Sequence, residues 1–431
     1  MNLPTRPMGV PDSGMASSYD YQSEHDASAS AYVGQHAREA LKSHQFPIRF
    51  TGSGSEYFRI WIVNLLLLIV TLGIYYPWAK VRKLRYFYSH TEVAGHPLDF
   101  HGNPRQMLRG FLLMAALLFL YGVAGNVNET AGAIAGLILA LVWPALLRAS
   151  LQFKLAQTSW RGLRFTFKGN LKDAYLVFLV PILLLVLAGA TFGGLMAVLV
   201  PKPAEGQTMA GHQIGMFILL SMLFMAAVMV LSAYTLWRLK AYQHRHYALG
   251  QWQTNFTATF GDMLKVFMRS SLVLLLGGLA VLVLAVLLVL LTGGLSGSAH
   301  EIPMRLMKSM AVLVPVFIVG VFLVQMLYTA HLTATLQNLV WTRTGNRQIR
   351  FKSDLSHWSL MGLMIKNLLL TALTLGLYWP FAAVATARLK LEAVAVHTRQ
   401  HPDDLVVQVQ RSYKDGAGDM AADLMGMDVG L

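Results

Sequence analysis

The chain has 431 residues, of which 55% are hydrophobic and only 13% are charged. A soluble domain carries about 25% charged residues, so this composition excludes an ordinary soluble protein. The absence of cysteine excludes disulfides, thiolate metal sites and cysteine nucleophiles. The net charge is +14, and residues 49–399 hold 30 basic against 10 acidic residues. Because these basic residues flank apolar segments, they indicate membrane orientation and anionic lipid rather than nucleic acid.

The two ends of the chain differ from its middle. Residues 1–45 are rich in Ser, Ala, Gly, Asp and His and contain no continuous apolar run. We therefore expect a disordered cytoplasmic tail there, without a cleavable signal peptide. Residues 400–431 carry six acidic and two basic residues, which predicts a second tail that is acidic and flexible. The membrane domain should then occupy residues 46–399.

An apolar motif opens this domain. Residues 62–81 read IVNLLLLIVTLGIYYPWAKV, and a basic amphipathic stretch begins at the end of the motif. Basic side chains beside a membrane segment attract anionic lipid head groups. The predicted head-group contacts, which include two arginines from a later loop, are Lys80, Arg82, Lys83, Arg85, Arg161 and Arg164.

Long apolar windows follow the opening motif. They lie at 112–121, 131–147, 174–200, 216–236, 271–292 and 310–328. A stretch of about 20 apolar residues is long enough to cross the bilayer as a helix. The sequence therefore predicts a mainly α-helical, polytopic membrane protein with six full transmembrane helices.

Short strand patterns recur between the helical segments. They end near Phe50, Phe100, Phe167, Phe260 and Phe351. After each strand comes an apolar segment and then a basic amphipathic helix. This repeated order predicts five related units separated by short cytoplasmic β-strands or hairpins. The approximate limits of these units are 46–90, 91–157, 158–247, 248–340 and 341–399.

A second copy of the opening motif closes the domain. Residues 365–384 read IKNLLLTALTLGLYWPFAAV, and twelve of the twenty positions match residues 62–81. The shared residues that we single out as a membrane-core motif are Asn64, Thr71, Gly73, Tyr75 and Pro77, with Asn367, Thr374, Gly376, Tyr378 and Pro380. Two interpretations stay open: the asparagines join helices and Gly-x-Tyr-x-Pro ends a helix, or the broken segments mark a substrate site of a transporter.

The distribution of basic residues predicts the topology. Few basic residues lie near 122–130, 201–213 and 293–309, so these loops belong outside, and the strands and both termini belong in the cytoplasm. Both flanks of the opening motif are basic. A re-entrant hairpin that turns at Gly73 keeps both flanks inside, whereas a length of about 20 residues fits a single span. The two short segments are therefore re-entrant or spanning, which gives six to eight spans.

The run from Phe50 to Gly102 carries a family resemblance. It includes Phe58-Arg-Ile-Trp61, Thr71-Leu-Gly73-Ile-Tyr75 and Pro77-Trp-Ala-Lys-Val-Arg82, and it resembles the YjgN-like family of bacterial inner-membrane proteins, which is classed as a domain of unknown function. The resemblance covers roughly residues 46–400. The closing copy departs from it, with Phe381, Ala383 and Ala385 in place of Trp78, Lys80 and Arg82. The resemblance implies a multi-pass location in the bacterial inner (plasma) membrane and supplies no reaction.

The sequence contains no recognisable reaction centre. No Asp or Glu lies at mid-depth in a predicted span, and the histidines are scattered. We therefore predict no catalytic residues, no metal site and no cofactor. The expected function is that of a non-enzymatic protein that binds lipid or organises the envelope, with the lipid bilayer, anionic lipids included, as its partner. The alternative is a transporter or permeation pathway for a small or amphipathic solute, which a polar cavity joining Asn64 and Asn367 would favour.

Overall fold

The computed structural model describes residues 44–200, 210–292, 302–399, 403, 404, 406 and 407. Six helices in this part of the chain are long and apolar enough to cross a membrane. They coincide with the six apolar windows, so that prediction is confirmed. These helices are α4 (Pro104–Val127), α5 (Glu129–Ala156), α6 (Leu171–Leu199), α7 (Gly211–Arg245), α8 (Phe260–Leu291) and α9 (Ile302–Thr342). The two predicted tails lie almost wholly outside the described residues.

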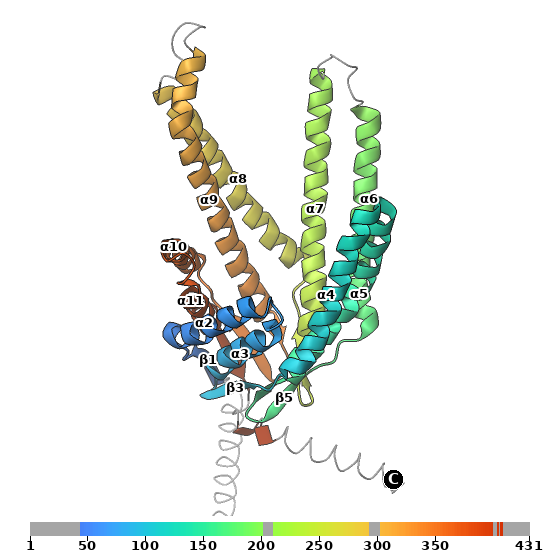
Figure 1. The fold of residues 1–431 in the computed structure, drawn as a ribbon, viewed down its shortest axis with the longest axis vertical. Helices are drawn as coiled ribbons and strands as arrows, with labels where there is room; N and C mark the ends of the chain where they lie inside the picture. The colour runs from blue at the N-terminus through green and yellow to red at the C-terminus, as the bar shows by residue number, and fades with distance from the viewer. Residues whose placement is uncertain (1–43, 201–209, 293–301, 400–402, 405, 408–431) are drawn as a thin grey trace, which may run out of the picture.

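Shorter helices come from the two copies of the motif. The opening copy lies in α2 (Gly54–Val70) and α3 (Tyr76–Ser89), and the closing copy in α10 (His357–Leu373) and α11 (Trp379–Glu392). Figure 1 shows α4 to α9 extending to one side of the sheet, whereas these shorter helices stay close to it. In the same view α2 runs nearly across the direction of α7.

Within the described residues, eleven short strands form one antiparallel sheet, in the order β7-β6-β5-β4-β3-β2-β1-β11-β10-β9-β8. The strands are β1 (His44–Phe50), β2 (Thr91–Val93), β3 (His96–Phe100), β4 (Thr158–Trp160), β5 (Leu163–Phe167), β6 (Tyr247–Leu249), β7 (Trp252–Gln253), β8 (Asn255–Phe256), β9 (Thr344–Gly345), β10 (Ile349–Ser353) and β11 (Val394–Thr398). Only Thr254 separates β7 from β8 along the chain. These two strands stand at opposite ends of the hydrogen-bonded order, so the backbone through Thr254, rather than a further strand pairing, completes a ring of strands.

The first and last strands take part in this ring. His44 to Pro47 of β1 pair with β11, and Ile48 to Phe50 of the same strand pair with β2. Strands β3 and β5 divide their pairing between two neighbours in the same way. The divided pairing links each of these strands to the neighbours on both sides, so the strands follow one another around the ring.

The helices follow the same circular order. Helix α3 contacts α4, α5 contacts α6, α7 contacts α8, α9 contacts α10, and α11 contacts α2. In four of these five contacts, a side chain on the second helix of one pair donates to a backbone carbonyl just before the next pair. The bonds are Arg148 Nε to Gly169 O (2.8 Å), Trp237 Nε1 to Ala258 O (2.9 Å), Asn338 Nδ2 to Leu355 O (3.0 Å) and Arg388 Nη2 to Gly52 O (2.9 Å).

One predicted strand end is wrong, and a second is shifted by two residues. Phe260 is the first residue of α8, and the preceding strand ends at Phe256. The Asp262 carboxylate accepts from the Thr259 backbone at 3.0 Å, and the Thr259 hydroxyl accepts from the Asp262 backbone at 3.2 Å. This capping box starts the helix at Phe260. Phe351 lies in the middle of β10, which continues to Ser353.

Candidate functional site

The opening motif forms a helical hairpin with a sharp break. Leu72 and Gly73 have φ angles of 49° and 89°, and the Gly73 backbone donates to Leu68 O at 2.8 Å. This left-handed C-terminal bond ends α2. The Thr71 hydroxyl donates to Leu67 O at 2.7 Å and accepts from the Tyr75 backbone at 3.0 Å, so it satisfies groups on both sides of the break.

The closing motif repeats this break bond for bond. Leu375 and Gly376 have φ angles of 50° and 95°, and the Gly376 backbone donates to Thr371 O at 2.7 Å. The Thr374 hydroxyl donates to Leu370 O at 2.7 Å and accepts from Tyr378 at 2.9 Å. Pro77 and Pro380 are fully buried at the start of the second helix of each hairpin. The backbone N–H that proline lacks would have no acceptor within the helix at this position, so its loss costs no hydrogen bond.

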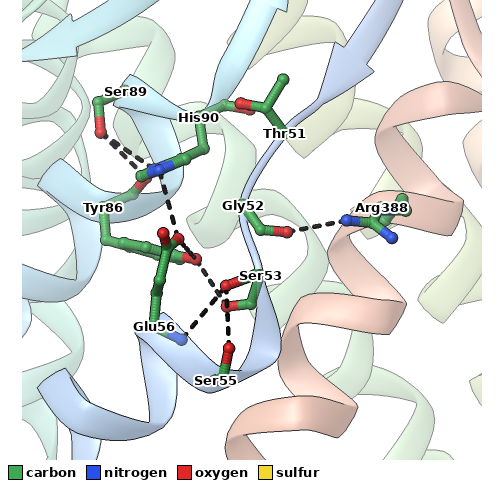
Figure 2. Close-up of polar contacts among 9 residues, drawn as sticks. All are labelled: Thr51, Gly52, Ser53, Ser55, Glu56, Tyr86, Ser89, His90 and Arg388. Carbon is green, nitrogen blue, oxygen red and sulfur yellow. Dashed lines mark hydrogen bonds and ion pairs between the residues drawn. The ribbon is translucent and has the colours of Figure 1, made fainter.

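The two ends of the α2–α3 hairpin lie together. The Tyr86 hydroxyl donates to Ser53 O at 2.7 Å and lies 3.3 Å from a Glu56 carboxylate oxygen, and His90 Nε2 lies 3.8 Å from the same oxygen. Figure 2 shows this cluster at the start of α2, with Arg388 reaching Gly52 from the neighbouring hairpin. Residues 53 and 90, at the two ends of the hairpin, therefore lie close together at its base.

Buried phenols stabilise this base without adding charge. Burial raises the pKa of the Tyr57 hydroxyl to about 12, and the neighbouring Tyr86 contributes in the same direction. Burial also raises the pKa of the Tyr86 hydroxyl. The two rings stack with centroids 5.3 Å apart. Both phenols stay protonated near neutral pH, so Tyr86 remains a hydrogen-bond donor at the base of the hairpin.

A groove opens between α2 and α3 above this base. It has a volume of about 440 Å³ and is lined by Arg59, Ile60, Val63, Arg82, Arg85, Tyr86 and Ser89. Among the described residues, no carboxylate forms an ion pair with any of the three arginines. The groove therefore combines three positive charges with an apolar wall.

Asn64 and Tyr75 hold one of these arginines in place. Arg82 Nη1 donates to Asn64 Oδ1 at 3.4 Å, and the guanidinium lies 5.6 Å from the centroid of the Tyr75 ring. Asn64 itself is only 6% exposed. A guanidinium fixed at one end keeps its other donors directed at a ligand, which reduces the entropy lost on binding.

The tips of both hairpins expose large apolar side chains. Leu72 is 93% exposed and Leu375 is 94% exposed. Other exposed apolar side chains surround them, namely Ile69, Val70 and Ile74 in one hairpin and Leu373 and Leu377 in the other. A cluster of exposed apolar side chains at the end of a hairpin is typical of a surface that meets lipid or a partner.

The structure separates the predicted head-group residues. Arg82 and Arg85 line the groove, whereas Lys80 and Lys83 lie over the rings of Tyr76 and Trp379 at 5.8 and 5.3 Å. Arg161 and Arg164 lie in the β4–β5 hairpin and are not among the groove residues. Arg161 pairs with Asp403 at 2.6 Å, and head-group contact by Arg161 and Arg164 stays a prediction.

Sequence reasoning missed the α2 side of the groove. Arg59 and Val63 lie one helical turn apart and face Arg82 and Arg85 only because the chain folds back at Gly73. The spacing of four residues was a usable signal. It needed the hairpin to be known first, since a single span would place Arg59 and Arg85 on opposite sides of the membrane.

Asn64 and Asn367 do not contact each other. Asn367 Nδ2 donates within its own hairpin, to Ala382 O at 3.4 Å and Thr386 Oγ1 at 3.3 Å, and its buried Oδ1 has no hydrogen-bond partner among the described residues. The two hairpins contact each other through aromatic rings instead. The ring centroids of Trp61 and Trp379 are 6.2 Å apart, and those of Phe58 and Phe381 are 5.8 Å apart. In the described residues, no group of three or more His, Asp or Glu side chains could hold a metal ion.

Comparison with known proteins gives a family without an assigned activity. The profile of a family described as "Bacterial protein of unknown function (DUF898)" matches residues 45–424. "Inner membrane protein YjgN" of Escherichia coli O157:H7 is 31% identical over 156 residues, which cover 35% of this chain and 38% of that protein. The protein of the same name from Salmonella typhimurium is 31% identical over 150 residues, covering 33% and 37%. The match thus spans less than two fifths of these relatives, and no solved structure matches the chain.

Proposed function

The chain belongs to the DUF898 family of bacterial proteins of unknown function, and from that premise we propose that it is a non-enzymatic lipid-binding protein of the inner membrane. The groove between α2 and α3 carries this proposal. Three arginines line it beside the apolar residues Ile60 and Val63, and no carboxylate in the part of the chain that the structure describes pairs with them. Arginine side chains at head-group level bind anionic lipid, and an apolar wall accepts the start of an acyl chain.

The orientation of the hairpin supports this role. The hydrogen bond from Tyr86 to Ser53 joins its two ends, so a single crossing of the membrane is disfavoured and a re-entrant hairpin is favoured. Helix α2 lies nearly across the direction of α7 (Figure 1), which favours shallow entry into one leaflet. The exposed Leu72 at the tip would then lie among acyl chains, and the groove at the hairpin base would lie among head groups.

The positive-inside rule supports a cytoplasmic location for the sheet and both termini. On this assignment the hairpin enters the inner leaflet, which is where bacterial cytoplasmic arginines meet lipid. The strand–helix–helix–strand order and the repeated joining bonds support the division into five related units. The α2–α3 and α10–α11 pairs would be short members of this series, and the three long pairs would cross the membrane.

The alternative function, a transporter or permeation pathway, has less support. That proposal needs a polar cavity that joins Asn64 and Asn367. Each amide instead bonds inside its own hairpin, and aromatic rings fill the contact between the hairpins. Envelope organisation through the hairpin tips remains compatible with lipid binding, because the same tips would anchor both.

Lipid retention tests the proposed function. The protein would be extracted in mild detergent from membranes that contain phosphatidylglycerol, and the retained lipid would be measured by mass spectrometry. Arg59→Gln/Arg82→Gln/Arg85→Gln should lose the anionic lipid, since each arginine near the surface contributes about 1 kcal/mol. The matched control is Arg164→Gln/Arg350→Gln/Lys352→Gln, which removes three exposed charges from the sheet. Equal retention by both triple variants would refute the groove as a lipid site.

Single cysteines test the orientation, since the chain has none of its own. Ser55 and Ser89 are exposed near the two ends of the hairpin. An impermeant thiol reagent applied to intact spheroplasts should label neither Ser55→Cys nor Ser89→Cys, and both should react after lysis. Labelling of one without the other before lysis would mean that the segment crosses the membrane.

A further inference from the structure

We infer that the groove between α2 and α3 selects a phosphate group with two negative charges, the head group of a phosphomonoester lipid, over the singly charged phosphodiester of most membrane lipids. This inference rests on the proposed lipid-binding function and names its ligand class. It follows from the number of charges in the groove, from their geometry, and from the path that leads away from them.

The charges come first. Arg59, Arg82 and Arg85 place three guanidinium groups around one groove, and its lining contains no acidic side chain. A phosphodiester would neutralise one of the three charges, whereas a phosphomonoester neutralises two. The second ionisation of a phosphomonoester has a pKa of about 6, and nearby guanidinium groups favour the doubly charged form.

The absence of acidic lining residues also discriminates against zwitterionic head groups. The ammonium of an ethanolamine head group would enter a site that offers it three arginines and no carboxylate. The nearest acid on α2, Glu56, is occupied at the base by Tyr86 and His90. Repulsion of the wrong head group adds to attraction of the right one.

Geometry favours a phosphomonoester over a carboxylate, which has only two oxygens, and charge favours it over a sulfate ester, which has three terminal oxygens but a single negative charge. A guanidinium forms paired hydrogen bonds with two oxygens of the same group. A phosphomonoester has three terminal oxygens, which is enough to engage donors from both α2 and α3 at once. The bond from Arg82 to Asn64 and the Tyr75 ring beneath it fix one donor before the ligand arrives.

The path out of the groove points to a lipid rather than a soluble phosphate. Val63, Leu66 and Val70 follow Arg59 at helical spacing, and they are 46%, 57% and 78% exposed. They form a stripe along α2 from the groove to the tip. A ligand with a phosphate at the arginines would lay its acyl chain along this stripe. A free phosphate would leave the stripe unused.

Competitive binding tests the inference. Phosphatidate and phosphatidylglycerol with identical, fluorescently tailed acyl chains would be titrated into the detergent-purified full chain at pH 8. Phosphatidate should bind at least tenfold more tightly, and this preference should shrink toward equality at pH 5, where the monoester carries a single charge. Arg59→Gln/Arg82→Gln/Arg85→Gln should remove the preference, and Arg164→Gln/Arg350→Gln/Lys352→Gln should retain it. The single variant Arg59→Gln, whose guanidinium makes no hydrogen bond with a described residue, should lower the preference severalfold without affecting the thermal unfolding midpoint.

The other outcomes separate the possible failures. Equal affinity for the two lipids, both dependent on the arginines, would overturn the selection for a doubly charged head group and leave the proposed function standing. Lipid affinities that do not depend on the arginines would overturn both. Complete competition by inorganic phosphate at a concentration equal to that of the lipid would mean a soluble phosphate ligand, and would overturn the lipid as its source.

Discussion

The α2–α3 and α10–α11 hairpins share a backbone and differ in charge. Both break at a leucine and a glycine with left-handed φ angles, and both use a threonine hydroxyl to bridge the break. The groove residues diverge: Arg59, Arg82 and Ser89 correspond to Gly362, Ala385 and Glu392. The residues that form the break are therefore shared by the two hairpins, whereas Arg59 and Arg82 of the groove are present only in the first.

One arginine is present in both hairpins and has a different contact in each. Arg85 lines the groove of the first hairpin. Arg388, at the matching position of the second, donates to Gly52 O at 2.9 Å and ties the last helix to the beginning of the first hairpin. The second hairpin therefore contributes to closing the ring, and the first is free to bind a ligand. The following variants test this division of labour in matched pairs.

The hairpin tips should give the largest effect, and the same effect in both hairpins. Leu72→Asp and Leu375→Asp replace the most exposed apolar side chain of each tip with a carboxylate. If each tip enters the leaflet, each change should cost about 3 kcal/mol of insertion. A bimane label on Ile74→Cys or Leu377→Cys, quenched by brominated acyl chains, reports the depth of each tip. Quenching that persists in both Asp variants would show that the tips do not enter the acyl region. Leu72→Met and Leu375→Met are the matched controls.

Variants of the two matching arginines should have different effects: one should lower thermal stability, and the other should weaken lipid binding. Arg388→Gln removes a charged donor to Gly52 O and should destabilise the fold by about 2 kcal/mol, measured as a lower midpoint of thermal unfolding. Arg85→Gln should leave that midpoint unchanged and should weaken binding of phosphatidylglycerol severalfold. A drop in lipid binding in Arg388→Gln with an unchanged midpoint would contradict the division of roles.

Replacing the glycine at either break with alanine should reduce the stability of the fold by the same amount. Gly73 and Gly376 have φ angles of 89° and 95°, and a Cβ added at either would meet nothing within 4 Å. The cost of Gly73→Ala or Gly376→Ala is therefore conformational rather than steric, and amounts to roughly 1 kcal/mol. Each change should lower the unfolding midpoint by the same few degrees. Unequal shifts would mean that one break is stabilised by contacts that the other lacks.

The sequence alone was enough to predict the six long helices and to offer a turn at Gly73 as one of two interpretations, because both depend on local signals. Apolar windows of about 20 residues gave the six long helices, and the Thr-Leu-Gly-x-Tyr-x-Pro pattern marked the turn. The ring could not be predicted. Strands such as β7 and β9 are two residues long, too short for an alternating pattern, and β1 pairs with β11 from the other end of the chain.

The same distinction applies to the residues of the groove. Arg82 and Arg85 were predicted because they follow an apolar segment directly. Arg59 was missed because it reaches the groove only through the fold of the hairpin. The pairing of Arg161 with Asp403 was not predicted, because Asp403 lies beyond β11 and far from Arg161 in the sequence. Long-range pairing of this kind leaves no periodic signal in a single sequence.

The two buried asparagines give the smallest and most specific test. Asn64 orients Arg82 through a bond of 3.4 Å, whereas Asn367 bonds to Ala382 O and Thr386, and its own Oδ1 has no partner within the described parts of the chain. Asn64→Ala should weaken lipid binding about threefold, the equivalent of roughly 0.7 kcal/mol for one modest hydrogen bond. Asn367→Ala should leave lipid binding unchanged, because no arginine depends on it. Its effect on stability should also be small, since the loss of two long bonds is offset by removal of a buried acceptor that has no donor. If both variants lowered lipid binding equally, the asparagines would act together, and the shared polar pathway of the transporter alternative would regain support.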